Sequence, residues 1–240
     1  METLLDENFK PSDVRLKLQS TEGDIFHEQL SDQPIPYKNF LVSGVYNYNT
    51  KSLRVQDTHV VLNGVEVNAQ AELMHDEHKI EGPVKFWIDR VSHSKVVGLW
   101  PKFLEGDAIE AWIVDKMSKG IFDKVSAQFD FVGFKQDIEG EQLWQSDLKN
   151  IIADFSVEGM RVDYRAPLDA ATGLYGSGRY DVNADLLSLD VKKGKIGALD
   201  VKGSQLKFSH LAAVGKGQAD LSIGLRGEIG DVLRLSLIHI

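Results

Sequence analysis

The chain has 240 residues, of which 42% are hydrophobic, a formal net charge of −9 and no cysteine. This length fits one large β domain or two smaller domains, and the hydrophobic fraction is typical of a globular chain. The acidic charge and the lack of a basic stripe argue against nucleic acid as a partner, and the lack of cysteine excludes disulfides and thiol chemistry.

The sequence is not expected to contain a transmembrane helix or a signal peptide. No run of about 18 apolar residues is present, so no transmembrane helix is predicted. The opening METLLDENFKPSD has neither a basic segment nor an apolar segment of a signal peptide. The chain closes on LRLSLIHI, and we interpret it as a fragment whose residues 236–240 are a non-native or truncated tail.

The first hundred residues alternate apolar and polar side chains, which predicts half-buried strands. Strands are expected over residues 40–48 and 53–62, and Asn63-Gly64 then predicts a type I′ hairpin turn. The next strand places five apolar residues on one face, opposite Glu66, Asn68, Gln70 and Glu72. These five are candidates for a ligand-facing surface: Val65, Val67, Ala69, Ala71 and Leu73.

Residues 101–120 break this alternation and predict one amphipathic helix near residues 107–119. Asp107 can act as the N-cap with Glu110 three residues later, and Gly120 suits the position after the helix. Four apolar residues recur at helical spacing and are expected to cover the sheet: Ile109, Trp112, Ile113 and Met117. Trp112 fits either a core anchor or a gate over the sheet.

Strand alternation resumes after the helix and continues to residue 235. Residues 175–187 are expected to form one strand, with Tyr180, Val182 and Ala184 facing the same side. The second set of candidate surface residues is Val125, Ala127, Phe129, Phe131, Tyr180, Val182 and Ala184. Core packing and contact with an apolar ligand favour the same residue types, so Phe129 and Phe131 fit both roles.

The sequence therefore predicts a mostly β fold: a long, curled antiparallel sheet with one amphipathic helix. Its segments are residues 1–100, the helical segment 101–120, and residues 121–235. Because strands twist, a long meander curls, and its apolar concave face needs a second sheet, a helix or a ligand to cover it.

Sites for catalysis, metal or phosphate are weakly supported. His75 and His78 flank Asp76 and Glu77 in HDEH, but this run reads as a solvated turn more readily than as a metal site. The glycines between Gly173 and Gly178 precede strands rather than a helix, so they predict tight turns and not a phosphate loop. No catalytic residues, metal ligands or cofactor are predicted.

Three segments together resemble the AsmA-like family, in the branch that includes YhdP and TamB. They are residues 99–131 with the Trp-bearing helix, residues 155–211 with the Tyr and Pro-Leu unit, and residues 221–235. The resemblance implies a taco-shaped, repeating β-groove protein of the Gram-negative periplasm, anchored in the inner membrane through a segment outside this chain. It further implies that the groove holds phospholipid acyl chains, and that other envelope proteins are possible partners.

Two alternatives remain open at this point. The apolar face could be the closed core of a structural β-sandwich, such as an adhesin or stalk repeat. The chain could also be a carbohydrate-active β enzyme, which would need acids converging on a concave face. The small residues Ala69, Ala71 and Ala184 favour room for a narrow ligand, and the acids Asp181 and Asp185 are expected to point outward.

Overall fold

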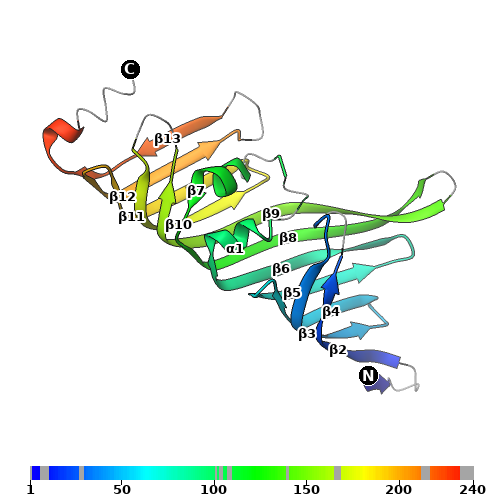
Figure 1. Ribbon diagram of the computed structural model, residues 1–240. Coiled ribbons are helices and arrows are strands. Elements are labelled where there is room, and N and C mark those ends of the chain that lie inside the picture. Colours follow the sequence, from blue (N-terminus) through cyan, green and yellow to red (C-terminus); the bar gives the residue numbers. More distant parts are fainter. Residues whose placement is uncertain are drawn as a thin grey trace. The chain divides into compact units, whose positions relative to one another are not determined.

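The protein, described here from a computed structural model, is mostly β, as predicted. The structure describes residues 2–5, 11–26, 30–100, 102, 105–106, 110–138, 141–164, 169–211 and 217–232. Figure 1 shows the strands and the short helices. The strands before the helices are β1 (Glu2–Leu5), β2 (Pro11–Ile25), β3 (Ile35–Asn47), β4 (Ser52–Leu62), β5 (Val65–His75) and β6 (Lys79–Ser92).

Two short helical segments follow β6. They are α1 (His93–Val97) and the π-helical segment η2 (Ala111–Lys116). The remaining strands are β7 (Met117–Ser118), β8 (Ile121–Ile138), β9 (Glu141–Val162), β10 (Ala171–Asp181), β11 (Leu186–Ile196), β12 (Leu199–Ser209), β13 (Gln218–Ser222) and β14 (Leu225–Arg226).

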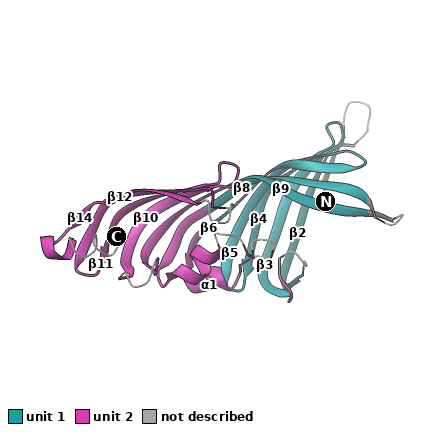
Figure 2. Ribbon diagram, turned by 90° about the horizontal axis from the view of Figure 1, so that it is seen from above, with its two compact units in different colours: residues 1–26, 33–88, 126–152 teal, residues 27–32, 89–125, 153–240 magenta. Residues whose placement is uncertain are grey.

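The strands form one antiparallel sheet that does not close on itself. Its order is β1-β2-β3-β4-β5-β6-β8-β9-β10-β11-β12-β13, with β14 on β12 and β7 on β9. The chain divides into two compact units, coloured separately in Figure 2. Unit 1 comprises residues 1–26, 33–88 and 126–152, and unit 2 comprises residues 27–32, 89–125 and 153–240.

The predicted hairpin at Asn63-Gly64 is confirmed. Both residues have positive φ angles, 47° and 74°, which a type I′ turn requires, and they join β4 to β5. The turn fixes the register in which Leu62 faces Val65 and Val60 faces Val67. The alternation of β5 is therefore locked to that of β4.

The expected helix over residues 107–119 ends earlier than predicted. Glu110 is helical, η2 spans Ala111–Lys116, and Met117 already pairs with Val162 of β9. Ladder hydrogen bonds to β9 thus replace the last turn that helical spacing predicted, and α1 is a further helix that the sequence did not predict. The proposed cap Asp107 and the residue Ile109 lie outside the described residues, as does the tail 236–240.

Gly120 is required for a different reason from the one predicted. It has a φ of +75° in the turn between β7 and β8, and an added Cβ would lie 2.8 Å from the Met160 Cα of β9. Strand β9 therefore approaches this turn so closely that only glycine fits.

The strand expected over residues 175–187 is confirmed for residues 175–181, which lie in β10, but it is wrong beyond them, because residues 182–185 form a turn between β10 and β11. The Asp181 carboxylate accepts hydrogen bonds from the backbone N–H groups of Asn183 and Ala184, both at 3.1 Å. Asp185 then adopts a φ of 46°. This aspartate-based turn interrupts a pattern that looks continuous in the sequence.

Candidate functional site

In unit 1, the apolar residues of β5 lie on one face of the sheet. Val65 is 3% exposed, and the side chains of Val67, Ala69, Ala71 and Leu73 are half-buried. Glu66, Gln70 and Glu72 are exposed, whereas Asn68 is half-buried. The five candidate residues of β5 therefore share one side of the strand.

Cross-strand register extends this face over neighbouring strands. Ala69 faces Thr58 of β4 on one side and Phe86 of β6 on the other, and the Phe86 ring lies 6.3 Å from the Phe129 ring of β8. Directly opposed residues in an antiparallel sheet share a face. We call the following set the unit 1 apolar face: Val42, Val55, Val60, Val65, Val67, Ala69, Ala71, Leu73, Val84, Phe86 and Phe129.

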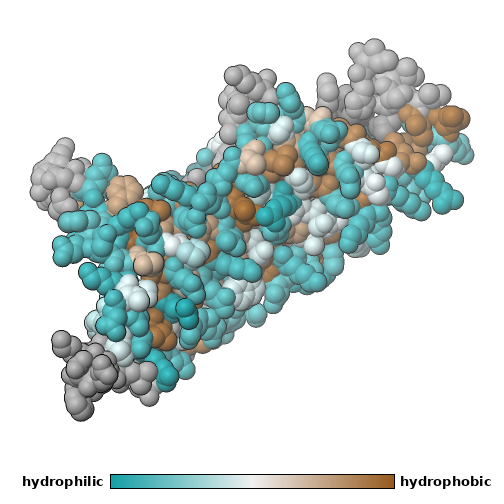
Figure 3. Space-filling view, turned by 180° about the vertical axis from the view of Figure 1, so that it is seen from behind, coloured by the Kyte–Doolittle hydropathy of each residue, from teal (hydrophilic) through white to brown (hydrophobic). Residues whose placement is uncertain are grey.

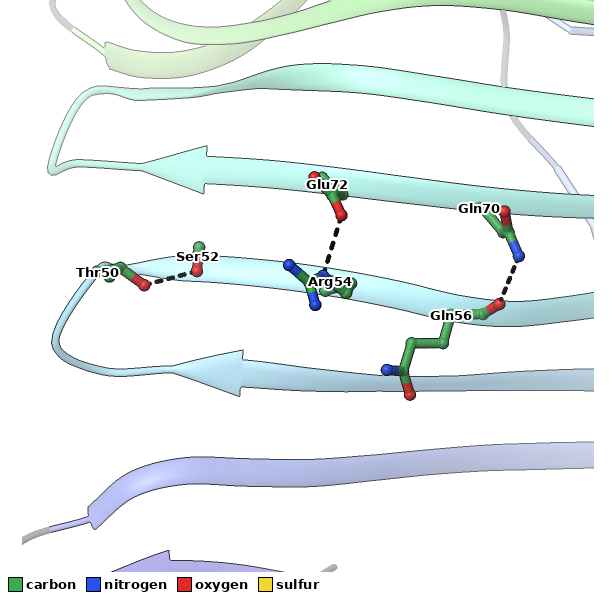
Figure 4. A network of polar contacts seen from close by, with 6 residues as sticks. All are labelled: Thr50, Ser52, Arg54, Gln56, Gln70 and Glu72. Carbon is green, nitrogen blue, oxygen red and sulfur yellow. Dashed lines mark hydrogen bonds and ion pairs between the residues drawn. The ribbon is translucent and has the colours of Figure 1, made fainter. Parts of the chain in front are cut away.

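The opposite face of the same strands carries polar pairs (Figure 4). Arg54 and Glu72 form an ion pair at 3.0 Å across β4 and β5, and the Gln70 side-chain amide donates to the Gln56 carbonyl at 3.0 Å. Near the turn, the hydroxyls of Thr50 and Ser52 lie 2.7 Å apart. Because these groups are exposed, each pair contributes at most about 1 kcal/mol, but together they mark this part of the face as solvated.

The unit 1 apolar face has no second layer of sheet among the described residues. All strands belong to one open sheet, and most apolar side chains on this face remain half-buried. A closed sandwich would bury both inner faces almost completely. Figure 3 shows one side of the molecule, where hydrophilic side chains predominate and apolar side chains lie among them.

Unit 2 covers its apolar face with helical segments. Tyr180 of β10 faces Leu187 of β11, which faces Phe208 of β12, and the Trp112 ring of η2 packs 5.3 Å from the Phe208 ring. Tyr180 and Leu187 are buried, and Met160 of β9 is 0% exposed. This part of the sheet is therefore a core.

His93 in α1 connects the two helical segments of unit 2. Its Nε2 lies 2.7 Å from the carbonyl oxygen of Ile113 in η2, and its ring stacks on Phe122 at 6.4 Å. A carbonyl oxygen can only accept, so Nε2 carries the proton and donates it. His93 is 8% exposed, so this hydrogen bond is shielded from water and fixes η2 on unit 2.

The remaining predicted site residues divide between the two units. Val125 is half-buried in unit 2, while Ala127 is buried and Phe131 half-buried in unit 1. Trp112 and Ile113 lie in η2, and Met117 lies in β7. Val182 and Ala184 are exposed in the turn after β10, so their assignment to the same apolar strand face as Tyr180 is wrong.

The glycines between Gly173 and Gly178 lie inside β10 and do not form the predicted turns. A Cβ added at Gly178 would lie 2.4 Å from the Phe155 ring, so the missing side chain makes room for that aromatic ring. Sequence reasoning also missed His93 and Phe122. A histidine just after a strand carries no local signal of such a role.

Open depressions occur in both units. In unit 1 a depression of about 640 Å³ is lined by residues of β2, β3 and β4, including Lys17, Gln19, Phe40 and His59. In unit 2 a depression of about 510 Å³ is lined by residues of β9 to β12 together with Lys124. Both mix apolar and charged residues.

The HDEH segment forms the turn between β5 and β6. Asp76 Oδ1 accepts hydrogen bonds from the N–H groups of His78 and Lys79, both at 2.8 Å. The bond from His78 is the main cause that lowers the pKa of Asp76 below its ordinary value of 3.8. His75 Nε2 instead lies 2.7 Å from the Tyr46 hydroxyl, and no group of three potential metal ligands occurs in the described part of the chain.

The chain matches no family model, no curated protein and no solved structure. Among the helices that the structure describes, none has the length and apolar character needed to span a bilayer.

Proposed function

We propose that this chain is part of an AsmA-like, YhdP-like periplasmic protein whose sheet forms a groove for phospholipid acyl chains. In this proposal it carries phospholipid between the inner and outer membranes, supports outer-membrane integrity, and performs no catalysis. Segments outside these 240 residues would anchor it in the inner membrane. The observation that carries the proposal is the unit 1 apolar face, which spans β3 to β8 without a second sheet layer in the described residues.

The energetics of acyl chains support this use of an open apolar face. Removing one CH₂ group from water is worth about 0.8 kcal/mol, so an acyl chain of about 16 carbons gains on the order of 12 kcal/mol when fully buried. The unit 1 apolar face offers half-buried Val, Ala, Leu and Phe side chains for such contact. Ala69 and Ala71 leave space beside them for a narrow chain.

The polar face supports the same proposal. Arg54, Glu72 and Gln70 keep part of the other side of β4 and β5 in water, although Val45, Val61 and Trp87 also lie on that side. A lipid on the apolar face could keep its head group at the solvated border.

The test is to purify the chain after expression in a Gram-negative host and to measure co-purified phospholipid by mass spectrometry. The wild type should carry phospholipid. Val67→Asp should carry much less, because a carboxylate against hydrocarbon costs several kcal/mol or must protonate. Gln70→Asp is the matched control, since it places the same charge on the polar face of the same strand, and it should keep its lipid.

Circular dichroism checks that each variant remains folded. A wild type without lipid would contradict the proposal. Equal lipid on the wild type and on folded Val67→Asp would show that β5 does not contact the acyl chain. Unfolding of Val67→Asp, with no lipid on the wild type, would favour the closed structural sandwich.

A further inference from the structure

The solvated face of β10, β11 and β12 in unit 2 concentrates positive charge. Along β10, Ser177 and Arg179 are exposed whereas Gly178 and Tyr180 are buried, so the odd-numbered residues of this stretch point away from the core. Directly opposed residues share a face, and the register therefore extends this face over β11 and β12. Apart from the half-buried Ser188, its members are exposed. We call the following set the unit 2 basic array: Tyr175, Ser177, Arg179, Ser188, Asp190, Lys193, Lys202, Gln205 and Lys207.

At one end of the array, two lysines face each other across β11 and β12. Lys193 is directly opposite Lys202, and the Lys193 Nζ lies 4.0 Å from the centroid of the Tyr175 ring. This contact places the Lys193 ammonium on the solvated face. Lys202 is exposed beside the buried Val201, so it lies on that face as well. Like charges at opposed positions destabilise a sheet, and an anion bound between the two ammonium groups would remove that repulsion.

At the other end of the array, a hydroxyl group lies between two cations. Ser188 is opposite Arg179 of β10 and opposite Lys207 of β12, which in turn is opposite Asp220 of β13. Arg179 Nη1 donates to both carboxylate oxygens of Asp154 at 3.1 Å, and this ion pair orients the guanidinium. Nε and Nη2 of the same guanidinium carry further N–H donors. A guanidinium, a hydroxyl and an ammonium side by side are donors suited to a phosphate group.

The open depression of unit 2, about 510 Å³ in volume, lies over the middle of the array and over its Ser188 end. Its lining includes Ser177, Ser188 and Gln205, whose hydroxyl and amide groups donate and accept hydrogen bonds as sugar hydroxyls do. Sites for small molecules have volumes of about 300–1,000 Å³. A strand rises about 3.3 Å per residue, so the step from Tyr175 to Arg179 separates the two cationic ends by about 13 Å. The array therefore offers two anion-binding ends with a hydrogen-bonding surface between them.

We propose that the unit 2 basic array binds a phosphorylated sugar or a related polyol phosphate, with a phosphate at each cationic end and the hydroxyls of its body over the middle. Charge complementarity selects an anion, because the array holds four cations and one carboxylate, Asp190, in a chain whose net charge is −9. With the bordering residues Lys124, Asp154 and Asp220 included, cations still outnumber carboxylates by five to three. This local excess attracts phosphate to one region of an acidic protein.

The proposal is independent of the lipid proposal, since every residue of the array belongs to unit 2 and none belongs to the unit 1 apolar face. Isothermal titration calorimetry with fructose 1,6-bisphosphate at low ionic strength is the direct test, and a Kd below about 1 mM is expected. Glucose 6-phosphate should bind at least about threefold more weakly, because one phosphate engages one end only, and glucose should not bind detectably. Raising NaCl to about 0.5 M should weaken binding of the bisphosphate.

Charge variants test both ends of the array. Lys202→Gln and Lys207→Gln should each weaken binding of fructose 1,6-bisphosphate about threefold or more, whereas Lys85→Gln, the same change on an exposed residue of β6, should leave it unchanged. Asp190→Asn should instead tighten binding about threefold, because it removes the carboxylate between the two phosphates. Asp57→Asn, exposed on β4, is its matched control. A gain of affinity in Asp190→Asn cannot come from loss of the fold.

Vesicles distinguish a lipid head group from a soluble sugar phosphate as the source of this chemistry. Phosphatidylglycerol carries a phosphate and glycerol hydroxyls, so co-sedimentation with its vesicles that is lost in Lys202→Gln and Lys207→Gln would assign the site to a lipid head group. Phosphatidylcholine vesicles are the control. Binding of fructose 1,6-bisphosphate without such co-sedimentation would assign it to a soluble ligand. Binding of neither probe, glucose bound as tightly as the bisphosphate, or affinities indifferent to Lys202, Lys207 and Asp190 would each overturn the proposal.

Discussion

The two units treat similar apolar strand faces in opposite ways. In unit 2, η2 lies on the sheet through Trp112 and Phe208, and His93 fastens η2 by a partly buried hydrogen bond. In unit 1 the side chains of Val67, Ala71 and Leu73 stay half-buried. Apolar and polar residues alternate along the strands of both units. Whether such an apolar face becomes a buried core or a surface is therefore decided by the segments that pack on it, and not by the strand sequence.

The strongest test of this difference introduces a charge on each face. Leu187→Asp places a carboxylate where the exposed fraction is 6%, and it should lower the free energy of unfolding by more than about 3 kcal/mol. Val67→Asp should cost less than about 2 kcal/mol, because water reaches its half-buried position. Urea unfolding followed by circular dichroism measures both, and equal losses would mean that the two faces are equally covered.

Truncation of an apolar side chain should show the same difference more mildly. Met160→Ala empties a fully enclosed site in unit 2 and should cost about 2–5 kcal/mol. Leu73→Ala in unit 1 should cost about 1 kcal/mol, since only part of its side chain leaves water on folding. The same urea titrations compare the two, and a cost for Leu73→Ala as large as that for Met160→Ala would contradict an open unit 1 face.

The attachment of η2 to the rest of unit 2 can be weakened without removing an apolar side chain. His93→Phe keeps a ring beside Phe122 but leaves the Ile113 carbonyl without its donor, at a cost of about 1–3 kcal/mol. Amide hydrogen exchange over residues 111–116 should become faster. Ser94→Ala, exposed in the same helix, is the control; unchanged exchange in His93→Phe would show that the histidine does not fasten η2.

The smallest expected effect concerns the turn that closes the β5–β6 hairpin of unit 1. The pKa of Asp76 is lowered in the fold, so its contribution to stability is present above the ordinary value of 3.8 and is lost as the pH falls through the lowered value. Asp76→Ala should therefore be less stable than the wild type at neutral pH, and this gap should shrink in acid. Thermal unfolding between about pH 5 and pH 2 measures the gap, with Glu77→Ala as the control; a gap that is constant with pH would exclude the carboxylate as its cause.

Strand faces were predictable from the sequence where turn chemistry was explicit. The Asn63-Gly64 dipeptide predicted the turn between β4 and β5 and, with it, the side of each strand on which the apolar residues lie. The dipeptide is informative because few residues other than asparagine and glycine tolerate the φ angles of that turn. The turn after Asp181 was missed because it contains no glycine or proline, and the helix was overextended because pairing of Met117 with Val162 outweighed helical spacing. The position of η2 on unit 2 depends on the hydrogen bond between His93 and the Ile113 carbonyl. These residues are 20 positions apart, so no local sequence pattern predicts their contact.

The order of the strands has a consequence for how such a protein can change in length. From β1 to β6 and from β8 to β13, every strand pairs with the next strand along the chain. Such contacts are local in sequence, so a hairpin can form before its neighbours have folded. Duplication or deletion of a hairpin between two tight turns would lengthen or shorten the sheet without rerouting the chain. During evolution, the number of strands in a meander of this kind can therefore change by one hairpin at a time.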